Sequence, residues 1–387
     1  MEMKRFFYAL AIVLLFVPIV SVHAEQPKVE LATEARSAIL IERDTGAILY
    51  EKNAHEPLPP ASMTKIMTML LIMEAIDQGK LKLDERVRAS EYAASMGGSQ
   101  IFLEPGEEMT VDDLLKGIAI GSGNDASVAL AERIAGSEEA FVHLMNEKAR
   151  QLGLKHTAFE NTTGLPAKNH YSTAYDMAMM AKELLKYDLI TKYTGTYEDY
   201  LRENTDKKFW LVNTNRLVKF YPGVDGLKTG YTSEAKYCLT ATAKKGNMRV
   251  IAVVFGAPTP KARNAQITKM LDYAFSHYET KPLYKKGETI TMLPVSKGKK
   301  KSVAVVTSEP ISVLLKKGEK SDAVKTTWKL KETVKAPVKK GDTLGTLVVK
   351  KDRTVIAKSP LVAKEQVDEA NIWELFKRMF NSFSRTS

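Results

Sequence analysis

The pattern of apolar and polar positions divides the chain into a mixed helical and β-rich part and a later part of short β-type runs. In the first part, apolar runs bounded by turn residues predict strands at 38–41, 47–50, 226–232, 237–243 and 248–255. Helical periodicity and capping residues predict helices at 63–76, 114–120, 125–135, 174–185 and 263–278. Because strands lie at both ends and helices between them, we expect one antiparallel sheet with helices packed on its faces, an α/β (α+β) fold.

Residues 281–365 follow a second pattern. Short β-type runs separated by Lys-Gly turns predict strands at 302–307, 311–315, 343–349 and 354–357. This spacing is typical of a small β-sandwich or barrel. We therefore predict a first domain over residues 25–280 and a small all-β domain over residues 281–365.

Both ends of the chain indicate a cellular location. Residues 1–24 have a basic start, an apolar run and small residues before a cleavage point, as in a secretory signal peptide; an uncleaved anchor is the alternative. Within residues 366–387, an amphipathic helix is predicted from Ile372 onward. Its apolar arc contains Ile372, Trp373, Leu375, Phe376, Met379, Phe380 and Phe383. We expect an exported protein held peripherally on the outer face of the cytoplasmic membrane by this helix; docking on the protein core is the alternative.

Composition and charge narrow the classes of function. Of the 387 residues, 44% are hydrophobic, which excludes a disordered chain. The single cysteine, Cys238, excludes a disulfide framework, and no H-E-x-x-H motif occurs, so we expect neither metal nor cofactor. The net charge is +11, and residues 281–365 contain 21 Lys and Arg against 8 Asp and Glu. An exported protein meets no nucleic acid, so we expect anionic lipid or wall polymer to face this domain, with a merely soluble surface as the alternative.

The first candidate for catalytic chemistry is Ser62-Met63-Thr64-Lys65, at the start of a predicted buried helix. A spacing of three on a helix places the serine hydroxyl and the lysine amine on one face. The serine needs a base to take its proton, and an amine serves only if burial lowers its pKa. A second S-x-x-K pair, Ser233 and Lys236, falls on a predicted strand, where positions three apart face opposite sides, so we treat it as coincidence.

Two further motifs complete a set. Ser122-Gly123-Asn124 lies between two predicted helices, and Lys228-Thr229-Gly230 lies on a predicted strand. Taken alone, the first is better explained by a turn or a helix cap, and an exposed strand with a turn is the alternative for the second. In the order S-x-x-K, S-x-N, K-T-G, however, they form the set found in penicillin-binding proteins and serine β-lactamases. Together they predict one cleft in which Ser62 is the nucleophile.

The motifs with their flanks resemble low-molecular-mass penicillin-binding proteins, and more narrowly serine-type D-alanyl-D-alanine carboxypeptidases of Bacillus-like bacteria. The segments that carry the likeness are 60–65, 122–126 and 223–232. The resemblance implies a fold similar to the β-lactamase/transpeptidase class. It also implies a hydrolase of cell-wall biogenesis that removes the terminal D-alanine from peptidoglycan stem peptides ending in D-Ala-D-Ala and is inhibited by β-lactams.

The resemblance further implies catalytic roles for five residues. Ser62 would attack the carbonyl of the penultimate D-Ala, with Lys65 as general base. Ser122 and Lys228 would pass a proton to the departing D-alanine. Asn124 would hold the substrate amide.

Substrate-binding roles follow from the same resemblance. Thr229 would bind the terminal carboxylate, assisted by Arg263, for which a solvated helix charge is the alternative. The backbone N–H groups of Ser62 and Tyr231, which flank the cleft with Gly230, would form the oxyanion hole.

Two other functions remain open from the sequence. A serine β-lactamase shares the three motifs but needs a carboxylate that activates water, commonly within E-x-x-L-N, and this segment is absent; Glu160 is the nearest acidic residue. A penicillin-sensing or wall-binding protein without turnover is the non-enzymatic alternative.

Overall fold

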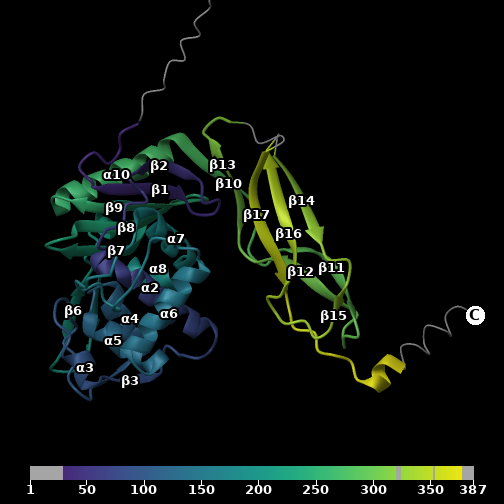
Figure 1. Ribbon diagram of the computed structural model, residues 1–387, viewed down its shortest axis with the longest axis horizontal. Coiled ribbons are helices and arrows are strands. Elements are labelled where there is room, and N and C mark those ends of the chain that lie inside the picture. Colours follow the sequence, from purple (N-terminus) through teal and green to yellow (C-terminus); the bar gives the residue numbers. More distant parts are fainter. Residues whose placement is uncertain (1–28, 320–323, 352–353, 377–387) are drawn as a thin grey trace, which may run out of the picture. The chain divides into compact units, whose positions relative to one another are not determined.

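The computed structural model describes residues 29–319, 324–351 and 354–376, and its first part contains a five-stranded sheet (Figure 1). The strand order is β2-β1-β9-β8-β7, and all neighbours are antiparallel. The strands are β1 (Ser37–Glu42), β2 (Ile48–Lys52), β7 (Val224–Thr232), β8 (Lys236–Lys245) and β9 (Met248–Ala257). Strand β1 pairs with β9, so segments far apart in the sequence lie side by side. The predicted antiparallel sheet is confirmed.

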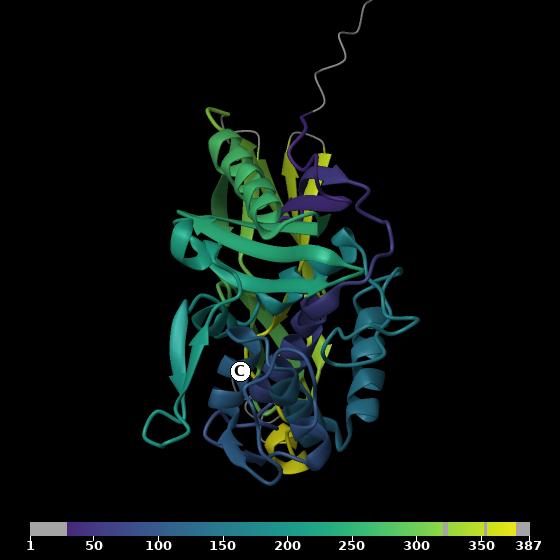
Figure 2. The ribbon, with the colours of Figure 1, turned by 90° about the vertical axis from the view of Figure 1, so that its left-hand side faces the viewer.

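Helices cover both faces of this sheet, as predicted. Helix α10 (Pro260–His277) lies on one face, and most other helices lie on the opposite face (Figures 1 and 2). Those helices are η1 (Ala61–Thr64), α2 (Lys65–Asp77), α3 (Glu91–Ala94), α4 (Val111–Ala119), α5 (Asn124–Ala135), α6 (Glu138–Gln151), α7 (Ala174–Leu184) and α8 (Ile190–Thr194). The short helix α9 (Leu217–Phe220) packs into the core on the α10 side through Leu217. In β1, Ala38 and Leu40 pack into the core on the α10 side, and Ile39 and Ile41 pack into the other core. Two covered faces explain why this strand is apolar at consecutive positions.

The centre of the larger core is α2. Ten of its 13 residues are buried, which is expected of a helix that is apolar on all sides. Beside α4 and α5 lie two short two-stranded sheets that the sequence pattern did not predict. They are β3 (Arg86–Arg88) with β4 (Glu108–Thr110), and the hairpin of β5 (Glu198–Leu201) with β6 (Phe209–Val212).

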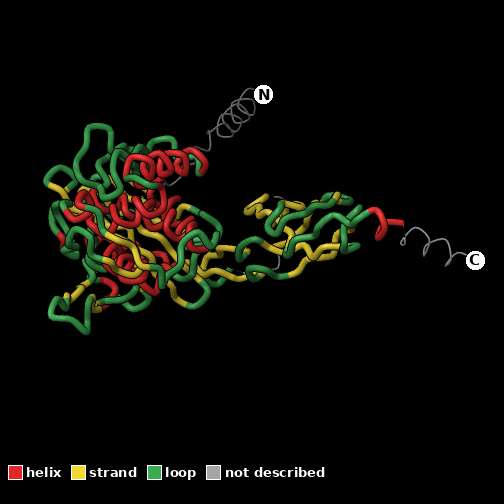
Figure 3. Tube along the Cα trace, turned by 90° about the horizontal axis from the view of Figure 1, so that it is seen from below, coloured by secondary structure: helices red, strands yellow, loops and turns green. Residues whose placement is uncertain are grey.

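The later part of the chain is all β, as predicted. Figure 3 shows strands and loops between α10 and a short C-terminal helix. A six-stranded sheet has the order β14-β16-β17-β12-β11-β15, and β10 pairs with β13. The strands are β10 (Tyr278–Tyr284), β11 (Thr289–Ser296), β12 (Ser302–Thr307), β13 (Ile311–Lys316), β14 (Val324–Leu330), β15 (Val334–Lys335), β16 (Thr343–Lys351) and β17 (Thr354–Ala363). Their inward side chains, among them Val303, Leu347 and Leu361, form a separate core.

The C-terminal helix begins at residue 372, where the apolar arc begins. Before it, Val367 pairs with Val338 and is buried in the core of the β domain, so residues 366–371 are not helical. Ile372, Trp373 and Phe376 are exposed. The rest of the predicted helix and the predicted signal peptide lie outside the described residues. Within the described ranges, no helix combines the length and the apolar character needed to cross a membrane.

Candidate active site

The structure brings the three motifs to one cavity. Ser62 lies in η1, Ser122 lies in the loop before α5, and Thr229 lies in β7. All three line a cavity of about 820 Å³. This volume is within the range of sites that enclose small molecules.

A glycine permits the close approach of β7 to η1. A Cβ added to Gly230 would lie 2.7 Å from the carbonyl oxygen of Pro60 and 3.1 Å from the Cβ of Ala61. Any other residue would push the strand away from the nucleophile, so Gly230 defines the width of the cleft at this point.

Ser62 lies in a 3-10 turn rather than in the predicted start of an α-helix. The turn η1 ends at Thr64 and α2 begins at Lys65. Pro60 precedes the turn. Ala61, its first residue, has a φ of 48°, a left-handed value that a regular α-helix does not contain. Because residues three apart eclipse in a 3-10 turn, the predicted proximity is retained: Nζ of Lys65 lies 3.3 Å from Oγ of Ser62.

Lys65 is a buried amine surrounded by acceptors. Its Nζ donates to Oδ1 of Asn124 at 2.6 Å and to the carbonyl of Thr163 at 2.8 Å. Burial is the main cause that lowers the pKa of Lys65 well below its usual value; the charge of Lys228 lowers it further, and Asp125 opposes the change. The uncharged amine is thereby available to take a proton from the serine.

The S-x-N motif forms the connection between α4 and α5. Ser122 is buried and has a φ of 65°, a left-handed conformation that is uncommon for serine. Asn124 is the first residue of α5, and its Nδ2 donates to the carbonyl of Gly97 at 2.6 Å. Its side-chain amide therefore joins Lys65 on one side to the loop at Gly97 on the other.

Lys228 is a second buried amine, close enough to Lys65 for its charge to lower the pKa of that residue. It is 1% exposed, and its Nζ donates to the carbonyl of Thr229 at 3.2 Å. Burial, helped by the charge of Arg263, lowers the pKa of Lys228 to about 7. The hydroxyl of Thr229 donates to Oγ1 of Thr214 at 2.7 Å, so a loop preceding α9 holds the K-T-G wall.

The other two predicted binding residues also line the cavity. The ring of Tyr231 is 55% exposed and stacks on Tyr237 at 4.5 Å between centroids. Arg263 lies in the first turn of α10 and is only 6% exposed, so it is not a solvated surface charge. Its guanidinium donates to Oδ1 of Asn264 at 3.0 and 2.9 Å, and burial lowers its pKa.

The sequence analysis missed seven residues that line the cavity: Ser99, Thr214, Arg216, Tyr237, Pro260, Lys261 and Asn264. Three of them, Ser99, Thr214 and Arg216, are polar residues of loops. Ser99 lies in a loop after α3, and the other two lie just before α9. None belongs to a motif, and polar loop residues are common. They are recognised as part of the site only because the fold places them in the cavity beside β7 and α5.

The second S-x-x-K pair is not part of the site, although the reason differs from the predicted one. Strand β7 ends at Thr232 and β8 begins at Lys236, so Ser233 lies in the turn between them. The premise that both residues lie on one strand is wrong. Ser233 and Lys236 are both exposed, and neither lines the cavity, which excludes them from its chemistry.

His170 is buried and hydrogen-bonded at both ring nitrogens. The backbone N–H of Glu160 donates to its Nδ1 at 3.2 Å, so Nε2 carries the ring hydrogen and donates to Oγ1 of Thr64 at 2.7 Å. Burial lowers the pKa of His170 to about 4, which keeps the ring neutral. The side chain of Glu160 itself is exposed. Among the residues described, no three His, Cys, Asp or Glu side chains form a group that could hold a metal ion.

This arrangement can perform acyl transfer. A serine hydroxyl beside an amine of lowered pKa is an activated nucleophile. A second amine of lowered pKa and a buried serine lie in the same cleft and can deliver a proton to a leaving group. The edge strand β7 offers backbone N–H groups to a developing oxyanion.

Comparisons with known proteins agree with this chemistry. Residues 21–259 match the family described as D-alanyl-D-alanine carboxypeptidase, and residues 278–369 match the family described as penicillin-binding protein 5, C-terminal domain. The chain is 68% identical to D-alanyl-D-alanine carboxypeptidase DacF of Bacillus subtilis over 92% of both chains. It is 36% identical to DacC of Escherichia coli over 96% of this chain and 95% of that one. The crystal structure of penicillin-binding protein 5 from Haemophilus influenzae is similar, with a TM-score of 0.67 and 34% identity over 87% of this chain and 98% of that one.

Proposed function

The chain belongs to the family of D-alanyl-D-alanine carboxypeptidases, and we propose that it removes the terminal D-alanine from peptidoglycan stem peptides through an acyl-enzyme on Ser62. One observation carries the choice of nucleophile: the buried Lys65 amine lies 3.3 Å from Oγ of Ser62 in the cavity that the K-T-G strand completes. Relatives of this family supply the substrate class. The enzyme is thus a serine hydrolase.

In the acylation step, Oγ of Ser62 attacks the carbonyl carbon of the penultimate D-Ala while its proton moves to Nζ of Lys65. The backbone N–H groups of Ser62 and Tyr231 stabilise the oxyanion. The C–N bond then breaks, and the proton that Lys65 took from Ser62 passes through Ser122 and Lys228 to the departing D-alanine nitrogen, which leaves Lys65 uncharged again. The pKa of Lys228, about 7, suits an amine that both takes and gives a proton near neutrality.

Substrate binding uses the other polar groups of the cavity. The hydroxyl of Thr229 and the buried guanidinium of Arg263 bind the terminal carboxylate of the peptide. The amide of Asn124 holds the substrate amide. Water then attacks the acyl-enzyme with Lys65 as base, which releases the shortened peptide and restores the serine hydroxyl.

The experiment is a D-alanine release assay with a diacetylated tripeptide that ends in D-Ala-D-Ala. The wild type should release D-alanine, and Ser62→Ala should reduce the rate by at least a thousandfold. Ser233→Ala is a matched control, because it removes the serine of the second S-x-x-K pair from an exposed turn, and its rate should equal that of the wild type. A labelled β-lactam that attaches to Ser62→Ala would contradict the proposal.

The same assay separates the alternatives. A β-lactamase would hydrolyse penicillin rapidly, which requires a carboxylate that activates water. Glu160, the nearest acidic residue in the sequence, is exposed and does not line the cavity, so it does not supply this group. A penicillin sensor would be acylated without releasing D-alanine from the peptide.

We also propose that the enzyme is exported after removal of residues 1–24 and is held on the outer face of the membrane by its C-terminal helix. The exposed side chains of Ile372, Trp373 and Phe376 support this assignment, because aromatic and aliphatic side chains insert readily at a lipid surface. Peptidoglycan precursors lie on the same side of the membrane, so this location brings the cleft to its substrate.

A further inference from the structure

One loop at the border of the cleft determines how Asn124 is oriented. We call residues 97–103 the rim segment; its Ser99 lines the catalytic cavity. The carbonyl of Gly97 accepts a hydrogen bond from Nδ2 of Asn124 at 2.6 Å, and the carbonyl of Ser99 accepts one from the backbone N–H of Asn124 at 2.7 Å. Because the amide nitrogen faces Gly97, the amide oxygen faces Lys65. A shift of the rim segment would therefore move the amide of Asn124.

The body of the domain holds the rim segment through Asp125. This residue follows Asn124 in α5, and its carboxylate is buried. It accepts hydrogen bonds from the backbone N–H of Ile101, at 3.1 and 3.0 Å to the two oxygens, and from that of Leu103 at 3.1 Å. Two consecutive residues of one helix thus contact the rim segment, one for catalysis and one for support.

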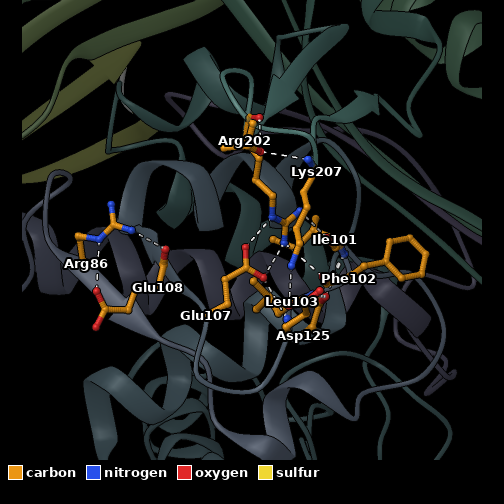
Figure 4. A network of polar contacts seen from close by, with 11 residues as sticks. Arg86, Ile101, Phe102, Leu103, Glu107, Glu108, Asp125, Arg202 and Lys207 are labelled. Carbon is orange, nitrogen blue, oxygen red and sulfur yellow. Dashed lines mark hydrogen bonds and ion pairs between the residues drawn. The ribbon is translucent and has the colours of Figure 1, made fainter.

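The β5–β6 hairpin holds the same stretch through Arg202. Its guanidinium donates to the carbonyl of Ile101 at 3.0 Å and to that of Phe102 at 3.2 Å. It also makes two hydrogen bonds with Glu107, at 2.6 and 3.0 Å. The two side chains are only 10% and 19% exposed. Figure 4 shows these contacts, with Arg202 above and Asp125 below the backbone of Ile101 to Leu103.

The conformation of Phe102 explains why contacts from two elements are needed. Its φ is 59°, a left-handed value that is unusual for an aromatic residue. Its ring is 64% exposed and makes an edge-on contact with Phe209 of the hairpin at 5.6 Å between centroids. Burial of this side chain therefore contributes little to fixing the backbone, and the hydrogen bonds of Arg202 and Asp125 hold it.

We propose that Arg202 is a positioning residue of the carboxypeptidase reaction, which fixes the rim segment from the hairpin so that Asn124 faces Lys65. This inference rests on the proposed function. The hairpin is well placed for such a role, because β6 leads directly to Thr214, which contacts Thr229 on the opposite wall of the cleft. The hairpin therefore contacts the rim segment through Arg202, and the loop that follows β6 contacts the K-T-G wall through Thr214.

The test measures D-alanine release and penicillin acylation in Arg202→Ala and Arg202→Lys. Lysine keeps the positive charge beside Glu107. It lacks the planar guanidinium with which arginine binds both Glu107 and two carbonyl groups. Both variants should lower kcat and the acylation rate by about tenfold, as expected when a catalytic group is misplaced. The thermal midpoint of Arg202→Lys should stay close to that of the wild type. A displaced Asn124 also loses a hydrogen bond that favours the charged Lys65 amine, so the acid limb of the acylation rate should move to lower pH.

Lys207→Ala is the matched control. Lys207 lies in the same hairpin and pairs with Glu104 at 2.6 Å, but it does not contact the carbonyls of the rim segment, so its kinetics should equal those of the wild type. Wild-type kcat and an unmoved pH profile in both Arg202 variants would overturn the inference. An equal loss in Lys207→Ala would also overturn it. A wild type that is acylated by penicillin yet releases no D-alanine would contradict the carboxypeptidase activity alone, since the acylation rates still decide the role of Arg202.

Discussion

Two buried amines with lowered pKa values distinguish this cleft at the scale of single residues. Lys65 and Lys228 are 0% and 1% exposed, and the positive charge of Lys228 helps to lower the pKa of Lys65. A lysine inside a protein destabilises the folded state to the extent that its charged form loses hydration. The property that makes these amines useful bases is therefore unfavourable for folding.

Lys228→Met should consequently stabilise the protein at neutral pH while abolishing catalysis. The folded chain releases the Lys228 proton near pH 7, whereas the unfolded chain holds it to about pH 10.5, so unfolding takes up a proton between these values. The free energy of unfolding of the wild type therefore rises with pH in this window, and the shift corresponds to roughly 5 kcal/mol. Urea unfolding should show Lys228→Met as the more stable protein at pH 7 and nearly equal to the wild type at pH 10.

A constant difference between Lys228→Met and the wild type across this pH range would contradict the lowered pKa. D-alanine release serves as the second measurement, because the variant lacks the amine that passes a proton to the leaving group. Retained activity would remove Lys228 from the mechanism while leaving the stability argument intact.

At the scale of elements, the contact between η1 and β7 determines the shape of the cleft. The strand approaches the 3-10 turn so closely that a single added carbon atom at Gly230 would meet the backbone of Pro60. Backbone atoms cannot move aside as a flexible side chain can. The strand and the turn must separate instead, which would move the backbone N–H of Tyr231, proposed to bind the oxyanion, away from Ser62.

Gly230→Ala should therefore lower kcat/KM for D-alanine release by at least a hundredfold and destabilise the domain by about 1 to 3 kcal/mol. Gly246→Ala is the comparison: it lies in the β8–β9 turn with a φ of 58° and open space for a Cβ. It should cost about 1 kcal/mol of stability and leave kcat unchanged. Normal kinetics in Gly230→Ala would show that the contact does not control the site.

The sequence predicted most elements of the sheet and its helices because their burial produces clear patterns. Strand β12, for example, is an apolar run with a turn at each end. Its predicted bounds match the observed Ser302–Thr307. Hairpin β5–β6 was missed because β5 reads Glu-Asp-Tyr-Leu, and only Leu201 of these four residues is buried. A strand with little burial leaves no alternation to detect.

The same reasoning applies to the site. The motif order predicted that Ser62, Ser122 and Lys228 would lie together, because three short motifs in a fixed order carry information that single residues do not. Arg202 and Arg216 carry no such signal, since arginine in a polar loop is ordinary. Arg202 binds carbonyl groups of a distant loop, and Arg216 lines the cavity beside distant segments. Only the folded chain brings these groups together.

At the scale of the whole molecule, the proposed membrane helix begins with a capping box. The backbone N–H of Glu374 donates to Oδ1 of Asn371 at 2.8 Å, and that of Asn371 donates to the Glu374 carboxylate at 2.9 Å. This reciprocal pair fixes the helix start immediately after the segment that packs on the β domain. The helix is therefore initiated by the protein itself and does not require lipid for its first turn.

A chain that ends at residue 371 should lose membrane binding. Sedimentation with vesicles of phosphatidylglycerol and phosphatidylcholine should pull down residues 25–387 at least tenfold more than residues 25–371, because the apolar face of the helix is removed. Phe376→Asp should weaken binding, whereas Glu374→Gln, which preserves the capping box, should not. Equal sedimentation of the truncated chain would assign binding to the lysine-rich β domain instead.

The pairing of β1 with β9 also sets an order of events in biosynthesis. The chain is made from its N-terminus, and β1 has β2 as its only sheet neighbour until residues 248–257 have been synthesised. The K-T-G strand, β7, is also synthesised long after Ser62. During most of synthesis the nucleophile therefore lacks the strand that completes its cleft. Such long-range pairing slows folding and leaves apolar strand edges unprotected in the interim. The nascent enzyme therefore cannot act on peptides until β9, near the end of its first domain, has been synthesised.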